Sequence, residues 1–132
     1  MTEAETVTPI HTGTVLVVDD EAMLLMLVAE TLRDAGFAVV EATDGKTALQ
    51  LLEANPEIEL LISDIKMPGM SGYEVAQMGR TLRPELKILL MTGYAQGAAP
   101  APFAQETVPV LYKPFNFEVL PTLARQILGK AQ

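Results

Sequence analysis

The chain has 132 residues, of which 49% are hydrophobic and 20% are charged, so we expect one globular domain with a buried core. Nine basic residues against 17 acidic ones give a net charge of −8, which argues against direct binding to nucleic acid because phosphate contacts require clustered Lys and Arg. The absence of cysteine excludes a disulfide, a thiolate zinc site and a cysteine nucleophile.

No membrane contact is expected, because no apolar run approaches the roughly 18 residues of a membrane span. The acidic and polar start of the chain has no signal-peptide pattern, so a cytoplasmic location is the default expectation. Residues 1–13 are interpreted as a flexible tail, and a single domain is predicted over residues 14–130.

Strands and helices alternate along the chain. In chain order we predict a strand over 14–18, a helix over 21–35, a strand over 37–42, a helix over 44–54, a strand over 59–63, a helix over 72–82, a strand over 86–91, a strand over 108–112 and a helix over 116–128. This alternation is typical of parallel strands joined by right-handed crossovers. It predicts an α/β fold, a doubly wound sheet with helices on both faces.

Two helices carry proline at awkward positions. A fourth helix is due over residues 95–109, but proline inside a helix costs about 3 kcal/mol, so we expect at most a short helix over 103–106. The breakers in that segment are Gly97, Pro100, Pro102 and Pro109. Pro121 would fall just past the first turn of the last helix, which is therefore expected to start late or to bend.

The first helix is apolar nearly all round. Its core stripe is predicted as Leu24, Val28, Leu32 and Ala35, at helical spacing. Leu25 and Met26 fall outside this stripe. They are either scattered surface residues or part of a docking face for a partner.

Polar residues follow four of the five predicted strands. Asp19 and Asp20 follow the first strand, Asp64 ends the third, Thr92 the fourth and Lys113 the fifth. The carboxyl ends of parallel strands share one edge, so these side chains should converge. Three carboxylates about 4 Å apart repel by roughly 4 kcal/mol per pair. Lys113 can offset part of this repulsion, and a hard divalent cation such as Mg²⁺ suits an all-oxygen cluster.

Each of these residues also has a simpler interpretation. Asp19 or Asp20 could cap the following helix, and Asp64 could cap a turn before the Pro-Gly loop. Thr92 is an ordinary strand end, and Lys113 alone would be solvated. The coincidence of all five at four strand ends favours a functional site.

The ordered set of motifs resembles the receiver domain of two-component response regulators. The matching residues are Asp19-Asp20, Asp64 with Met67-Pro68-Gly69 and Ser71-Gly72, Thr92-Gly93, and Lys113-Pro114-Phe115. The resemblance implies a flavodoxin-like (βα)₅ fold with a five-stranded parallel sheet in the order 2-1-3-4-5. It also implies that Asp64 accepts a phosphoryl group from a histidine kinase or a histidine phosphotransfer protein.

The resemblance also implies a role for each site residue. Asp20, Asp64 and the backbone carbonyl of Lys66 would bind Mg²⁺ or Mn²⁺, and Asp19 would hold metal-bound water. Lys113 and Thr92 would bind phosphoryl oxygens, and Gly93 would leave the approach open. The chain would catalyse only its own phosphorylation and dephosphorylation, so it is not expected to be an enzyme in the usual sense. The Lys113–Pro114 bond is a candidate for a cis peptide bond.

The switching residues depart from the family pattern. The position three residues before the lysine, where relatives usually carry an aromatic residue, is Val110. Tyr112 is expected on the same face and could take part of that role, and Tyr94 lies nearby in sequence. Lys66 and Tyr94 flank the expected path of attacking water, so they are candidates for setting the lifetime of the phosphoryl group.

The output surface implied by the resemblance consists of the fourth helix, the fifth strand and the fifth helix, and a homodimer through this surface is left open. No effector follows within the 132 residues, so the chain is interpreted either as a single-domain regulator or as a piece of a longer protein. Two rival functions stay open: a pseudo-receiver that works without phosphorylation, and a flavodoxin-like ligand-binding domain. The second would need a Gly/Ser/Thr-rich phosphate loop where this chain has Asp19-Asp20-Glu21.

Overall fold

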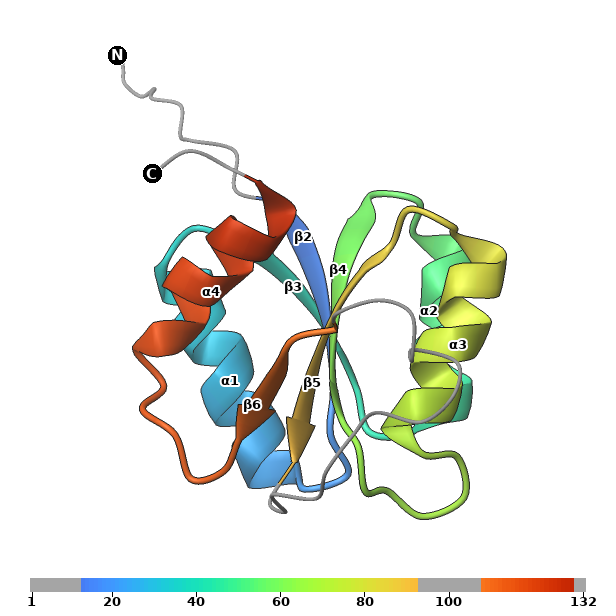
Figure 1. Cartoon of the computed structure of the whole chain (residues 1–132), viewed down its shortest axis with the longest axis horizontal. Helices are drawn as coiled ribbons and strands as arrows, with labels where there is room; N and C mark the ends of the chain where they lie inside the picture. The colour runs from blue at the N-terminus through green and yellow to red at the C-terminus, as the bar shows by residue number, and fades with distance from the viewer. Residues whose placement is uncertain (1–12, 93–107, 130–132) are drawn as a thin grey trace.

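The fold is a single parallel sheet covered on both faces by helices (Figure 1). The computed structural model describes residues 13–92 and 108–129. Its strands are β2 (Thr14–Val18), β3 (Ala38–Ala42), β4 (Ile58–Asp64), β5 (Lys87–Thr92) and β6 (Val110–Tyr112). They lie in the order β3-β2-β4-β5-β6, which confirms the predicted order 2-1-3-4-5.

The four described helices are α1 (Ala22–Asp34), α2 (Gly45–Ala54), α3 (Gly72–Leu82) and α4 (Val119–Leu128). Figure 1 shows α1 and α4 on one face of the sheet, and α2 and α3 on the other. Within the described ranges, no helix is long and apolar enough to cross a bilayer.

Each face of the sheet has its own hydrophobic core. Val15 and Val17 of β2 pack in the core beneath α1 and α4, whereas Leu16 and Val18 pack in the core beneath α2 and α3. This alternation follows from the period of two along a strand. β2 is buried at every position because helices cover both faces, as its continuous apolar run predicts.

Two predictions fall wholly or partly outside the described residues. The expected fourth helix over 95–109 lies almost entirely within residues 93–107, which the structure does not describe, and so does most of the tail over 1–13. β6 begins at Val110, two residues later than predicted.

The last helix starts three residues later than predicted, at Val119. Asn116 forms a turn before it: its side-chain oxygen accepts from the Glu118 N–H at 2.9 Å, and its carbonyl accepts from the Val119 N–H at 3.0 Å. Pro121 therefore lies in the first turn of α4, where a backbone N–H has no partner within the helix. The late start accommodates this proline without a break.

The predicted core stripe of α1 is confirmed at Val28 and Leu32, but the prediction that Leu25 lies outside the core is wrong. Leu25 is 4% exposed and belongs to the core together with Val28 and Leu32, whereas Leu24 is only partly buried. Met26 is 45% exposed, as expected. Because this helix is apolar nearly all round, its sequence pattern defines the buried face only loosely.

Candidate functional site

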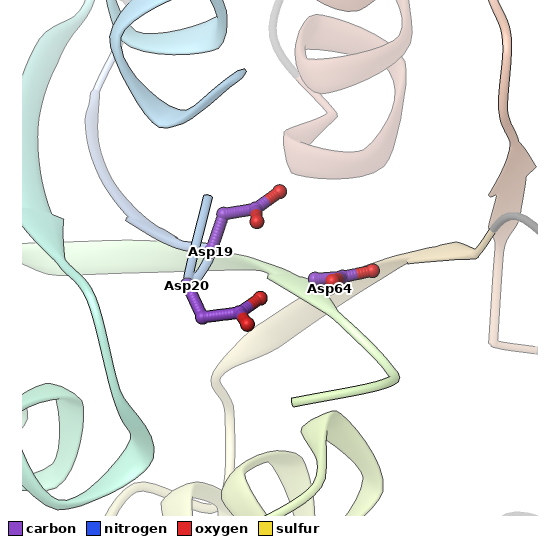
Figure 2. A group of neighbouring side chains, drawn as sticks. All are labelled: Asp19, Asp20 and Asp64. Atoms are coloured by element: carbon purple, nitrogen blue, oxygen red, sulfur yellow. The ribbon is translucent and has the colours of Figure 1, made fainter. Parts of the chain in front are cut away.

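Three carboxylates gather at the carboxyl edge of the sheet, as the strand ends predict. Asp19 and Asp20 follow β2, and Asp64 is the last residue of β4. One oxygen from each carboxylate lies within 4.8 Å of the other two. Figure 2 shows the three side chains turned toward a shared space. Asp19 and Asp64 are buried, whereas Asp20 is exposed and leaves one side of the cluster open to solvent.

Asp19 is fixed by its own backbone turn. Its Oδ1 accepts from the Glu21 N–H at 2.9 Å, and α1 begins directly afterwards. The N-cap of α1 is Glu21 and makes no side-chain capping bond, so neither Asp19 nor Asp20 is the helix cap that the simpler interpretation required. Asp19 Oδ2 is buried and has no hydrogen-bond partner among the described residues. A buried carboxylate oxygen normally has a hydrogen-bond donor or a cation beside it, so this oxygen is a candidate metal ligand.

Lys113 supplies the positive charge at the cluster. Its Nζ lies 3.2 Å from Asp64 Oδ1, to which it donates a hydrogen bond, and 3.6 Å from Asp19 Oδ2. Its backbone N–H donates to the carbonyl of Thr92 at 2.7 Å, which ties the end of β6 to the end of β5. The Lys113–Pro114 bond is cis, as anticipated. Thr92 itself is buried, at 5% exposure.

Burial dominates the electrostatics of both buried carboxyl groups. Desolvation raises the pKa of Asp19, and the Glu21 N–H and the Lys113 charge only partly oppose this effect. Desolvation likewise raises the pKa of Asp64; Lys113 opposes it, and the charges of Asp20 and Glu21 add to it. One lysine therefore does not fully compensate the cluster.

The residues present fit a hard divalent cation. The cluster pairs three carboxylates with the ammonium group of Lys113, and within residues 13–92 and 108–129 the buried Oδ2 of Asp19 accepts no hydrogen bond. Oxygen-only donor sets suit Mg²⁺ or Mn²⁺, whereas zinc sites usually include Cys or His. Asp19, Asp20 and Asp64 could therefore hold such an ion.

The loop after β4 is anchored at both ends. The Ile65 N–H donates to the carbonyl of Met91 in β5 at 2.8 Å, and the Gly72 N–H donates to the carbonyl of Ile65 at 2.8 Å. Gly69 has a φ of 79°, a left-handed conformation that glycine adopts without strain. Lys66, whose backbone carbonyl is a predicted metal ligand beside Asp20 and Asp64, is an exposed residue of this loop.

The predicted switch residues lie on β6. Val110 is partly buried against the core beneath α2 and α3, and it pairs in register with Leu90. Tyr112 pairs with Thr92, is two residues further along the same strand, and is 47% exposed. The alternation of the strand places both side chains toward the same face, as expected. Tyr94 and Gly93 lie outside the described residues.

Two further residues touch the backbone of Asp64, and their contacts were not anticipated. The Ser63 hydroxyl donates to the Asp64 carbonyl at 2.9 Å in a fully buried position. A Cβ placed on Gly72 would lie 2.2 Å from the same carbonyl oxygen. Gly72 belongs to a recognised motif, but its sequence position alone does not indicate which atom it contacts.

Comparison with known proteins gives a consistent result. The sequence model of the response regulator receiver domain family matches residues 15–125. The chain is 34% identical over 107 residues to the response regulator receiver protein CpdR of Brucella abortus, covering 80% of this chain and 88% of that protein. It is 32% identical over 120 residues to the sensor kinase CckA of the same organism, covering 89% of this chain but only 13% of the kinase.

A solved structure with a similar fold is that of the chemotaxis protein CheY4 of Vibrio cholerae. It is 31% identical to this chain, with a TM-score of 0.80, and the match covers 88% of this chain and 98% of that one.

Proposed function

The chain belongs to the response regulator receiver domain family, and on that premise we propose that Asp64 accepts a phosphoryl group from a phosphohistidine donor in a reaction that requires Mg²⁺ or Mn²⁺. The observation that carries the proposal is the bridge made by Lys113. One ammonium group lies 3.2 Å from Asp64 and 3.6 Å from Asp19, at the edge of a three-carboxylate cluster. This is the charge arrangement that an incoming phosphoryl group needs.

Asp64 is the proposed nucleophile. One of its oxygens attacks phosphorus, an O–P bond forms, and the bond from phosphorus to the donor nitrogen breaks. The proton required by the departing imidazole comes from solvent, to which the Asp20 side of the cluster is open. Lys113 holds Asp64 Oδ1 before transfer, which leaves the second carboxylate oxygen to attack. After transfer, the same ammonium group pairs with a phosphoryl oxygen.

Two further residues would serve the transferred group. The hydroxyl of Thr92 is proposed to donate to a phosphoryl oxygen, because Thr92 ends β5 and its carbonyl is tied to Lys113. A divalent cation held by Asp19, Asp20 and Asp64 would neutralise charge that develops on the phosphoryl oxygens. The chain is thus proposed to catalyse only its own phosphorylation and dephosphorylation.

The proposed contact surface for the donor protein is the exposed side of α1. Met23, Met26 and Leu27 are 70%, 45% and 39% exposed, and they lie within the first two turns after Asp20. Large apolar side chains exposed on the helix that follows Asp19 and Asp20 suit the packing of partner helices. A histidine kinase or histidine phosphotransfer protein is the proposed partner, in keeping with the likeness to a sensor kinase and to a receiver protein.

The proposed response to phosphorylation begins at Thr92 and reaches Val110 and Tyr112, because Thr92 and Tyr112 are neighbours in the β5–β6 ladder. Tyr112 is 47% exposed and Val119 of α4 is 41% exposed, so the described part of the proposed output surface has apolar groups available for a protein target.

Intact mass after incubation with acetyl phosphate and Mg²⁺ tests the central chemistry. The protein should gain one phosphoryl group that is lost in base, and the gain should be absent with a chelator and in Asp64→Asn. The exposed Asp44 provides a matched control, because it caps α2 by accepting from the Thr47 N–H at 2.7 Å and is not one of the three clustered carboxylates. Asp44→Asn should be phosphorylated like the unmodified protein. A phosphorylated Asp64→Asn, or an unphosphorylated wild type, would overturn the proposal.

A further inference from the structure

Three hydrogen bonds hold the two peptides that follow Asp64. The Ser63 hydroxyl donates to the Asp64 carbonyl, the Ile65 N–H donates to the Met91 carbonyl of β5, and the Gly72 N–H donates to the Ile65 carbonyl. These contacts come from β4 itself, from the neighbouring strand and from the first residue of α3. The first two bonds restrain the Asp64–Ile65 peptide directly, and the third restrains the Ile65–Lys66 peptide that follows it.

The strand ladder explains why the hydroxyl is needed. Pairing between β2 and β4 ends with Val18 opposite Ser63, whereas pairing between β4 and β5 continues to Asp64 opposite Met91. The carbonyl of Asp64 therefore lies one residue beyond the end of the ladder with β2. A buried carbonyl in that position requires a donor, and the Ser63 hydroxyl provides one at 2.9 Å.

Gly72, the first residue of α3, packs directly against the Asp64–Ile65 peptide. Leu61 of β4 packs in the core beneath α2 and α3, so Ser63, two residues later, faces the same helices. A Cβ on Gly72 would lie 2.2 Å from the Asp64 carbonyl oxygen and 2.8 Å from Ile65 Cα. The lack of a side chain lets the start of α3 approach this peptide closely enough for the Gly72 N–H to reach the Ile65 carbonyl.

We propose that Ser63 and Gly72 are positioning residues: they lock the Asp64–Ile65 peptide, and thereby fix the Asp64 carboxylate and the following loop in the geometry that binds the divalent cation. This inference rests on the proposed function, because it presumes a cation at the Asp19, Asp20 and Asp64 cluster. Groups that orient metal ligands typically contribute 10- to 100-fold to metal affinity. The cation site is thus largely formed before the ion arrives.

The test compares Ser63→Ala with Ser63→Thr, which keeps the hydroxyl. The matched control is Thr14→Val, because Thr14 is a buried hydroxyl-bearing residue at the opposite end of the same sheet. Calorimetric titration with Mn²⁺ should show about tenfold weaker binding for Ser63→Ala, near-wild-type binding for Ser63→Thr and no change for Thr14→Val. Circular dichroism establishes that each variant is folded.

Amide hydrogen exchange of the metal-free protein gives a readout that does not depend on phosphorylation. In Ser63→Ala, the Ile65 and Gly72 amides should exchange about fivefold faster, as loss of one hydrogen bond of ordinary net strength predicts. Mn²⁺ binding within twofold of wild type in Ser63→Ala, or equal losses in Thr14→Val, would refute the positioning role. If the wild type itself binds no Mn²⁺, the proposed function fails as well, so the two failures are distinguishable.

Discussion

Replacing Asp64, the proposed phosphoacceptor, with asparagine should stabilise the metal-free fold. In Asp64→Asn, the repulsion from Asp19 and Asp20 disappears, and at 4.8 Å and an effective dielectric near 20 each pair repels by roughly 3.5 kcal/mol. The attraction to Lys113 at 3.2 Å, roughly 5 kcal/mol on the same scale, is also lost. An uncharged side chain at position 64 also avoids the cost of burying a charge, which adds to the stabilisation. Solvent around the exposed Asp20 weakens its repulsion of Asp64, which reduces the stabilisation. The balance predicts a free energy of unfolding higher by about 1–2 kcal/mol at pH 7.

The stability difference between Asp64→Asn and the wild type should depend on pH in a predictable direction. Burial raises the pKa of Asp64 above its ordinary value of 3.8, so the folded protein binds more protons than the unfolded chain does. The wild type therefore loses stability as the pH rises from 3.8 through the raised folded pKa, and the loss levels off above it. The advantage of Asp64→Asn should be greatest near neutral pH and should shrink as the pH falls toward 4.

Urea denaturation in a chelating buffer, at a series of pH values, measures this effect. Mg²⁺ should reduce or reverse the difference in free energy of unfolding between Asp64→Asn and the wild type, because a ligand present at ten times its Kd stabilises the wild type by about 1.4 kcal/mol. Asp44→Asn is the control of opposite sign: hydrogen bonds from Thr47 hold the pKa of Asp44 below its ordinary value, so its amide should not stabilise the fold. If Asp64→Asn is less stable than the wild type at pH 7 without metal, Lys113 outweighs the repulsion and our view of the cluster is wrong.

Four other substitutions test separate parts of the structure. Gly72→Ala should lower the free energy of unfolding by about 1–3 kcal/mol and slow phosphorylation by acetyl phosphate, because its Cβ would overlap the Asp64 carbonyl. Gly69→Ala, with open space at its Cβ but a φ of 79°, should cost only about 1–2 kcal/mol by urea denaturation and largely spare the reaction. Arg83→Ala should lower the free energy of unfolding by about 1–3 kcal/mol without altering Mn²⁺ affinity. Its guanidinium donates to the carbonyls of Asn55, Pro56 and Ile58, between the end of α2 and the start of β4, at the opposite end of β4 from Asp64. Met26→Glu should slow phosphoryl transfer from a phosphohistidine protein but not from acetyl phosphate, and equal rates from the protein donor would count against docking on α1.

The site could be predicted from the sequence because its residues lie at the carboxyl ends of predicted parallel strands. A parallel sheet brings these ends to one edge, so the convergence of Asp19, Asp64 and Lys113 followed from the parallel direction of the strands, whereas the strand order was implied by the family resemblance. The distances within the cluster depend on the sheet register, which the apolar runs do not specify. Gly72 and Ser63 meet at one carbonyl only because α3 packs against the end of β4.

Helix boundaries and orientation were harder to predict. Leu25 was predicted to lie outside the core stripe of α1 but is buried, because apolar residues nearly all round the helix leave the edges of its buried face undefined by the sequence. The start of α4 was predicted at Asn116 but lies at Val119. The Asn116 side chain instead forms a turn before the helix, and the later start places Pro121 in the first helical turn. In both cases the local sequence was compatible with more than one helix start or orientation, and packing against the rest of the fold determined which one forms.

The most direct test of the central claim identifies the modified residue itself. After phosphorylation by acetyl phosphate and Mg²⁺, borohydride reduces an aspartyl phosphate to homoserine, and peptide mass spectrometry then locates that residue. We expect homoserine at position 64 alone, with Asp19 and Asp20 unmodified and no homoserine formed when Mg²⁺ is withheld. Homoserine at position 19 or 20, or at no position after a confirmed gain of a phosphoryl group, would contradict this expectation.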